Sequence, residues 1–274
     1  MSRPKELFVV SAFAEQFAAR EDVLISEMLK RYGPTKLITI RDISSPDQIQ
    51  DDAGYIFRCI YEHDLGHFDV VKMKPVFAAM EERRVPYIQQ WNGKGDQTGK
   101  GYLVNLYAEG HQVVPSFRDI EAAIRFNARN YLVKPLFGGT GHGIATVSRL
   151  ELRESSPALV ANAIIQPELK VQFETSLVYV DNAFQFAVKT RDSRWDLVVY
   201  KPDPREFKLA ETFIGWNPIK GVQRIDFLWA DDEPLLLELE DATAFLSLFD
   251  SDNTPRASFV EALYRSIMTC NYDH

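Results

Sequence analysis

The chain has 274 residues, 46% of them hydrophobic and 26% charged, which is the composition of a globular protein and not of a disordered one. Its formal net charge of −8 gives no general attraction to nucleic acid or anionic lipid, so neither is an expected partner. Two cysteines are too few for a disulfide scaffold, and no apolar stretch reaches about 18 residues, so we expect a soluble cytoplasmic protein.

The first ninety residues alternate short apolar runs with amphipathic segments. Strands are predicted over residues 7–10, 37–40, 55–60 and 85–88. Helices are predicted over residues 15–32 and 68–80. This alternation favours a parallel sheet covered by helices.

A glycine-rich polar segment over residues 92–101 follows and is the predicted boundary between lobes. Beyond it, helices are predicted over 102–109 and 117–127, and strands over 131–133 and 144–147. The last third is rich in strands, with hairpins predicted to pair 176–180 with 184–188 and 222–229 with 235–239. A final helix is predicted over 255–268.

The densest glycine cluster lies just after Lys134. It consists of Gly138, Gly139, Thr140, Gly141, His142 and Gly143. Its glycines let backbone N–H groups approach phosphate oxygens, and a lysine at the entrance adds positive charge. The order matches neither GxGxxG nor the P-loop. The alternative interpretation is a flexible hairpin turn beside a surface lysine.

Acidic side chains gather on the second of the predicted hairpins. Arg224 and Asp226 lie two apart and therefore share one face of a strand, as do Glu238 and Glu240. The intervening turn makes the two strands antiparallel neighbours, so three carboxylates converge beside one arginine. Crowded carboxylates are expected to raise one another's pKa, and a divalent cation such as Mg²⁺ would relieve that repulsion. The alternative is a solvated acidic face balanced by Arg224.

Taken in order, these features resemble the ATP-grasp superfamily from about residue 92 onward, whereas the first ninety residues match only as a generic α/β lobe. The resemblance implies an α/β fold made of α+β lobes. It has an N-terminal α/β lobe over residues 1–92, a small lid lobe over 93–165 and a C-terminal catalytic lobe over 166–274.

The resemblance also implies a role for each matching residue. Arg224 would steady the transferring phosphoryl group, and the Mg²⁺ ligands would be Asp226, Glu238 and Glu240. The residues that would bind ATP are Lys100, Lys134, the glycine cluster over 138–143, Gln166, Pro167, Glu168, Leu169, Glu174 and Lys189. Read alone, residues 166–169 are an ordinary strand exit. In the resemblance they form the hinge that reads adenine.

The implied activity is ATP-dependent ligation. A small-molecule carboxylate is activated as an acyl phosphate and joined to an amine or similar nucleophile, with release of ADP and phosphate. A homodimer is one option for the assembly. Two alternatives stay open: a phosphotransferase on the same fold, and a catalytically silent nucleotide-binding module. The chain also departs from the commonest motif, Glu-x-Asn followed by proline, because Glu240 stands in the position of the asparagine. Residues 201–206 do not align with the resemblance.

Overall fold

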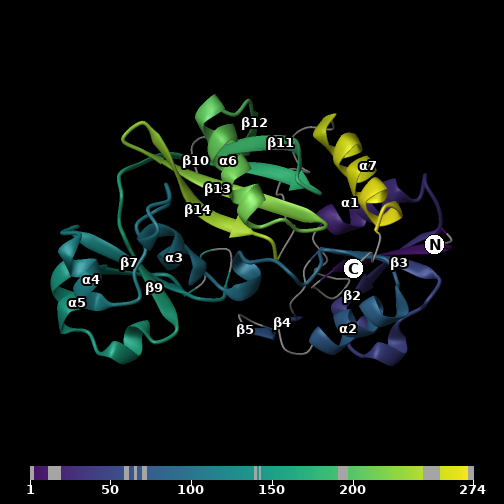
Figure 1. The fold of residues 1–274 in the computed structure, drawn as a ribbon, viewed down its shortest axis with the longest axis horizontal. Coiled ribbons are helices and arrows are strands. Elements are labelled where there is room, and N and C mark those ends of the chain that lie inside the picture. Colours follow the sequence, from purple (N-terminus) through teal and green to yellow (C-terminus); the bar gives the residue numbers. More distant parts are fainter. Residues whose placement is uncertain are drawn as a thin grey trace.

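The computed structural model describes residues 3–11, 20–58, 62–64, 67–69, 73–138, 141, 143–190, 197–242 and 254–270. The strands of this part form sheets of four, two, three and five strands. In Figure 1 the three-stranded sheet lies at the left, the five-stranded sheet at the top and the four-stranded sheet at the lower right. The predicted mixed α/β class is confirmed. Among the described residues, no helix combines the length and the apolar character that crossing a membrane requires.

The four-stranded sheet is parallel and has the order β2-β1-β3-β6. Its strands are β1 (Glu6–Ser11), β2 (Thr35–Thr39), β3 (Ala53–Phe57) and β6 (Tyr87–Ile88). The helices of this region are α1 (Arg20–Leu29), α2 (Lys74–Arg83) and the last helix, α7 (Thr254–Met268). Strands β1 and β3 are apolar on both faces because two separate clusters of buried side chains cover them.

The helix predicted over 68–80 begins later than expected. Phe68 lies in β5 (His67–Asp69), which pairs with β4 (Glu62–Asp64). Helix α2 starts at Lys74, with Pro75 in its first turn. Proline is favoured there because its missing N–H would have no partner in that turn anyway. Pro75 therefore marked the start better than the apolar periodicity did.

The three-stranded antiparallel sheet has β7 (Asn130–Pro135) between β8 (Ala145–Ser148) and β9 (Ala163–Pro167). Its small core is closed by α4 (Ile120–Arg125) and α5 (Arg149–Glu154). The glycine-rich segment and α3 (Tyr102–Ala108) lead into this sheet from the first one. The loop between β7 and β8 carries the glycine cluster.

The five-stranded sheet has the order β12-β11-β10-β13-β14 and is antiparallel throughout. Its strands are β10 (Val171–Val180), β11 (Ala183–Thr190), β12 (Leu197–Tyr200), β13 (Val222–Ala230) and β14 (Glu233–Glu240). Both predicted hairpins are confirmed. Each turns through two residues with positive φ, 49° and 65° at Asp181 and Asn182, and 49° and 63° at Asp231 and Asp232. Such turns match the twist of the flanking strands.

The sequence analysis did not predict helix α6 (Pro204–Trp216), which follows β12. Asp203 caps it by accepting from Arg205 N, and the Glu206 side chain accepts from the Asp203 N–H. Proline at the first helical position after an aspartate, with glutamate two residues later, is a helix-start signal that was present in the sequence.

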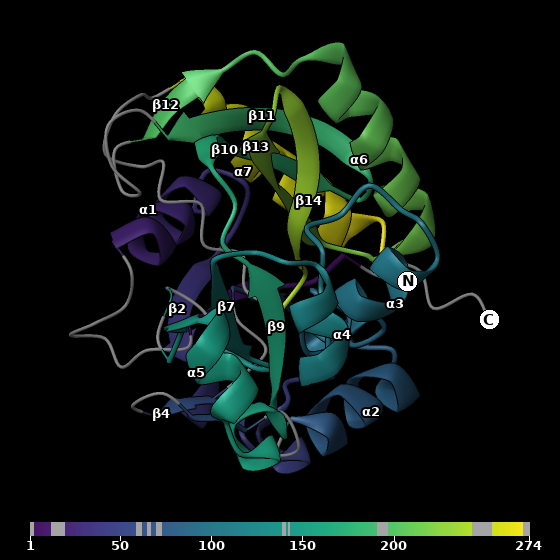
Figure 2. The same ribbon diagram turned by 90° about the vertical axis from the view of Figure 1, so that its left-hand side faces the viewer.

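The two faces of the five-stranded sheet have different partners. One face packs on α6 and α3 through Leu177, Ile225 and Phe227. On the other face, Val178 and Val180 pack against α7 and the parallel sheet. Figure 2 shows β14 above β7 and β9. Lys134 of β7 interacts electrostatically with Glu174 and Glu238, so the part of this second face that carries them lies toward the three-stranded sheet.

Phe259→Ala is expected to lower the free energy of unfolding by about 3–5 kcal/mol, because the ring is fully buried where α7 joins two sheets. The ring also makes an edge contact with Phe186 at 5.9 Å between centroids. Urea unfolding followed by circular dichroism measures the change. The control is Leu150→Ala on α5, where the side chain is 61% exposed and the loss should stay within about 0.5 kcal/mol. Equal losses in the two variants would contradict this account of the core.

Candidate active site

Paired carboxylates lie across β13 and β14. Asp226 is directly opposite Glu238, and Arg224 is opposite Glu240. Ser176 on β10 flanks Asp226 on its other side, so Glu174, two residues away, shares this face. The antiparallel register therefore produces the convergence that was predicted from the sequence.

Arg224 and Asp226 form a bidentate ion pair. Arg224 Nε donates to Asp226 Oδ1 at 2.8 Å, and Arg224 Nη2 donates to Oδ2 at 2.7 Å. Burial acts against the charge on Arg224, but Asp226, Glu240 and Glu238 outweigh it and raise the pKa of the guanidinium. The arginine therefore stays charged and its plane is held in one orientation.

Lys100 lies between two carboxylates. Its ammonium donates to Asp96 Oδ2, within the glycine-rich segment, and to Glu238 Oε2 on β14. Tyr102 Oη donates to Asp96 Oδ1 at 3.0 Å and accepts from the Leu239 backbone N–H at 2.6 Å. Because Leu239 follows Glu238, these contacts form a closed ring that begins and ends on β14.

The pKa of Glu238 is lowered to about 2. Burial, the largest single effect, raises it, but Lys100, Lys134 and Arg224 together outweigh burial. For this carboxylate, the expectation that crowded acids raise one another's pKa is wrong, because the cations Lys100, Lys134 and Arg224 lower it. Asp96 is subject to opposing effects: burial, with Glu238 and Glu240, raises its pKa, whereas its ion pair with Lys100 lowers it.

Lys134 approaches the same group from the three-stranded sheet. Burial lowers the pKa of its ammonium, whereas Glu238 and Glu174 act to raise it. The Lys100 backbone N–H donates to Leu136 O at 2.8 Å, which ties the segment before α3 to the end of β7. Cations from both sides therefore face the carboxylates of the five-stranded sheet.

The described part of the glycine cluster has the backbone that only glycine adopts readily. Gly138, Gly141 and Gly143 have φ of 149°, 76° and 74°. At Gly143 a Cβ would lie 2.9 Å from Pro135 Cγ. Gly139, Thr140 and His142 lie outside the described residues, so the phosphate-binding role of the cluster stays a prediction.

The predicted adenine hinge ends strand β9. Gln166 is buried; its Nε2 donates to Ser116 Oγ at 2.9 Å, and its Oε1 has no hydrogen-bond partner. Pro167 is the last residue of β9. Glu168 is exposed and accepts from Asn130 Nδ2 at 2.7 Å, while Leu169 packs against a small apolar cluster. A buried acceptor without a partner is what an incoming donor group would satisfy.

Lys189 does not lie with the charged side chains around Glu238. It lies opposite Thr175, whose hydroxyl donates to Glu206 of α6, so both side chains are on the face away from Glu238. The Lys189 ammonium lies 3.4 Å from the centroid of the Phe173 ring. A cation–π contact accounts for this placement.

Two buried aspartates were missed by the sequence analysis. Asp96 contacts Lys100 as described, and its signal was its position four residues before that lysine. Asp241 accepts from Gly95 N at 2.9 Å and from Gln97 N at 2.7 Å, which fixes the glycine-rich segment against β14. The segment predicted as a lobe boundary therefore also carries site residues.

The chemistry of these donors suits Mg²⁺, which prefers carboxylate oxygens. Within the described residues, however, no three acidic, histidine or cysteine side chains come together as a metal cage. Asp226 is engaged by Arg224 and Glu238 by Lys100. For these carboxylates to hold the ion, Arg224 and Lys100 would first have to give them up.

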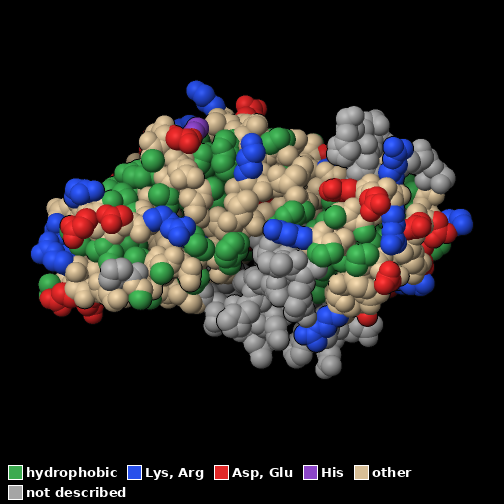
Figure 3. Space-filling model, turned by 60° about the horizontal axis from the view of Figure 1, so that its bottom comes forward, with side chains coloured by type: hydrophobic (Ala, Val, Ile, Leu, Met, Phe, Trp, Pro, Cys, Tyr) green, Lys and Arg blue, Asp and Glu red, His purple; other side chains and the backbone are tan. Residues whose placement is uncertain are grey.

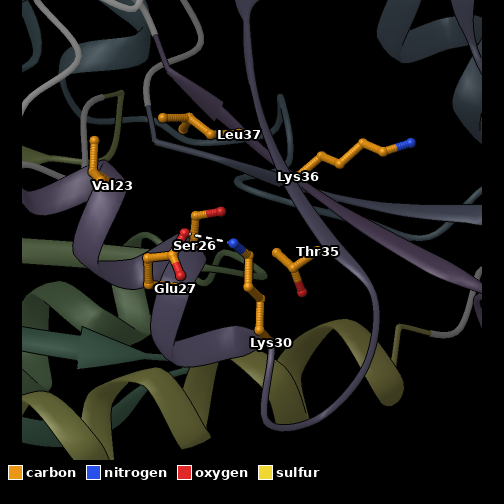
Figure 4. Close-up of a pocket in the computed structure, with 7 residues that line it drawn as sticks. All are labelled: Val23, Ser26, Glu27, Lys30, Thr35, Lys36 and Leu37. Atoms are coloured by element: carbon orange, nitrogen blue, oxygen red, sulfur yellow. Dashed lines mark hydrogen bonds and ion pairs between the residues drawn. The ribbon is translucent and has the colours of Figure 1, made fainter.

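A pocket between α1 and β2 is lined by Val23, Ser26, Glu27, Lys30, Thr35, Lys36 and Leu37. There Lys30 bonds Glu27, while the Lys36 side chain points away from the others (Figure 4). On the face shown in Figure 3, basic and acidic side chains are interspersed and do not form separate patches.

The chain has the ATP-grasp fold. It superposes on the D-cycloserine synthetase DcsG with a TM-score of 0.65 and 17% identity over 95% of this chain and 99% of that one. For D-alanine–D-alanine ligase from Bacillus anthracis, complexed with ATP, the TM-score is 0.66 and the identity 14% over 96% of both chains. For the ATP-grasp ligase PsnB, complexed with a phosphomimetic variant of a minimal precursor, Mg and ADP, the TM-score is 0.69 and the identity 14%. The match covers 97% of this chain and 100% of that one. No protein-family model matches the sequence. No curated protein matches it either.

Glu238→Gln is expected to lower the free energy of unfolding at pH 7 by about 1–3 kcal/mol, because the folded protein favours the charged carboxylate. The pKa is depressed from 4.5 to about 2, so this stabilisation is complete above pH 4.5 and is lost as the pH falls toward 2. Urea unfolding of both proteins at several pH values measures the difference, which should narrow in acid.

The matched control is Glu233→Gln, at the exposed start of the same strand, which should change stability by less than about 0.5 kcal/mol. A Glu238→Gln protein as stable as the wild type at pH 7 would contradict the ion-pair account.

Proposed function

We propose that this protein is an ATP-dependent ligase that activates a carboxylate as an acyl phosphate and joins it to an amine or similar nucleophile. The observation that carries the proposal is a cluster of charged side chains on β13 and β14. Asp226 lies opposite Glu238, and Arg224 lies opposite Glu240. Lys100 pairs with Glu238, and Lys134 interacts with it electrostatically. In a chain with the ATP-grasp fold, this charge pattern suits a triphosphate and its metal ion.

The nucleotide would lie between the three-stranded and five-stranded sheets. Lys134 and Lys100 would contact its phosphates, and the glycine cluster over 138–143 would cover them with backbone N–H groups. The exit of β9 at Pro167 would read the adenine edge. The carboxylates of Asp226, Glu238 and Glu240 would hold Mg²⁺, which neutralises phosphate charge when bound.

The chemistry has two displacement steps. A substrate carboxylate oxygen attacks the γ-phosphorus, and ADP leaves with the electrons of the broken P–O bond. An amine then attacks the acyl carbon and loses a proton, and inorganic phosphate leaves with the original carboxylate oxygen. Arg224 would stabilise the charge on the transferring group, since its guanidinium is fixed and always protonated.

The identity of the substrates is a separate question. DcsG is named for D-cycloserine, the Bacillus anthracis enzyme for D-alanine, and PsnB was solved with precursor peptides. We infer a small-molecule carboxylate and amine for this chain. We assign acceptor recognition to the N-terminal lobe and not to α6, because α6 packs on the sheet face away from Glu238.

An isotope experiment tests the ligase chemistry. Carboxylates labelled with ¹⁸O are screened with ATP, Mg²⁺ and amines, and released phosphate is analysed by mass spectrometry. A ligase is expected to transfer one ¹⁸O atom to phosphate and to yield an amide. A stable phosphorylated product would indicate a phosphotransferase, and MgATP binding without turnover would indicate a silent module. Failure of any nucleotide to raise the melting temperature of folded protein would contradict the nucleotide site itself.

Gly141→Ala is expected to reduce the catalytic rate at least about tenfold while adenosine affinity changes less than about twofold, because the loop contacts phosphates and adenine is read near Pro167. The control is Gly110→Ala. Gly110 also has positive φ, at 84°, but an added Cβ there meets no atom within 4 Å. Both variants carry similar backbone strain, so only Gly141→Ala should lose rate. Equal losses would mean that the cluster is a structural turn.

A further inference from the structure

The carboxylates suited to a metal are already paired with cations that belong to the chain. Glu238 accepts from the ammonium of Lys100, and Asp226 accepts twice from Arg224. The two pairs differ in how they are built. Arg224 lies two residues from Asp226 on the same strand, whereas Lys100 reaches Glu238 from another part of the fold.

Lys100 has a second carboxylate that holds it from the opposite side. Asp96 is buried, bonds the ammonium and also accepts from Tyr102 Oη at 3.0 Å. The Asp96 backbone belongs to the short helix Asp96–Thr98, which Asp241 anchors through Gly95 N and Gln97 N. Asp96 is therefore fixed by the fold independently of Glu238.

Glu238 is the less enclosed of the two partners. Its side chain is 25% exposed, against 8% for Asp96. It lies opposite Asp226 on the neighbouring strand. A contact between Lys100 and Glu238 can therefore break while Asp96 keeps the ammonium in the site. A buried ammonium left without any partner would carry a large desolvation cost, which Asp96 prevents.

We propose that Lys100 is a displaceable internal cation of the metal site: it occupies Glu238 in the nucleotide-free protein and moves to the nucleotide phosphates when metal takes its place, with Asp96 holding it throughout. This inference rests on the proposed nucleotide site. Its consequence is that metal and nucleotide bind as a unit. Metal alone must compete with Lys100 for Glu238, whereas the phosphates give Lys100 another anionic partner and release the carboxylate.

The test measures Mn²⁺ binding by electron paramagnetic resonance, with and without the non-hydrolysable analogue AMPPNP. Lys100→Met keeps the length of the side chain and removes its charge. It is expected to raise nucleotide-free Mn²⁺ affinity about tenfold, equivalent to about 1.4 kcal/mol. In wild-type protein AMPPNP is expected to raise the affinity for Mn²⁺, and this increase should be smaller in Lys100→Met. By linkage, the increase in AMPPNP affinity that Mn²⁺ causes should be smaller by the same factor.

Two further variants distinguish the direct Lys100–Glu238 ion pair from the general effect of removing a positive charge near the site. Lys134→Met removes a nearby cation for which the structure records no ion pair with Glu238, and it should raise Mn²⁺ affinity by less than about threefold. When Glu238 is already replaced by Gln, adding Lys100→Met should not raise the Mn²⁺ affinity further. A double-mutant cycle gives this result when the two residues act through one contact. A gain in affinity cannot come from a damaged fold, so the direction of the change is informative.

The proposal is overturned if Lys100→Met binds Mn²⁺ no more tightly than the wild type or than Lys134→Met. It is also overturned if the gain persists in the Glu238→Gln background. In either case wild-type binding of Mn²⁺ with AMPPNP would leave the proposed function standing. If folded wild-type protein binds no AMPPNP, the proposed function itself fails and the exchange fails with it.

Discussion

The ammonium of Lys100, lying between Asp96 and Glu238, is the contact on which the site depends. It joins the glycine-rich segment to strand β14, and Tyr102 closes the ring by bonding both Asp96 and the backbone next to Glu238. Buried charges of this kind persist only when partners and hydrogen bonds compensate for lost hydration. The ring supplies both, so the carboxylate face is held in place before any ligand arrives.

The five-stranded sheet shows how one surface serves both packing and chemistry. On one face, Val178 and Val180 of β10 pack against α7, while Glu174 of the same strand interacts electrostatically with Lys134 of the three-stranded sheet, and Ser176 lies opposite Asp226. The period of two keeps all four side chains on that face, and their position along the strand decides what they meet. The core therefore ends where the charged site begins, and α7 packs on β10, the strand that pairs with the Asp226 strand.

The likeness to known ATP-grasp ligases lies in this architecture. Identities of 14–17% accompany TM-scores of 0.65–0.69 over nearly the whole chain. A fold survives such divergence because burial pattern and volume matter more than residue identity. Substrate choice depends on side chains that line the site, which a shared fold leaves open.

Local patterns in the sequence determined most of the strands, both hairpins and the placing of Asp226 and Glu238 on neighbouring strands, because strand period and turn length operate over a few residues. The tertiary structure alone decided which cation meets which carboxylate. Lys100 reaches a glutamate 138 positions away, whereas Lys189, predicted for the same site, lies over Phe173 on the opposite face. Such contacts depend on how separate sheets pack, and no spacing along the chain encodes the distance between them.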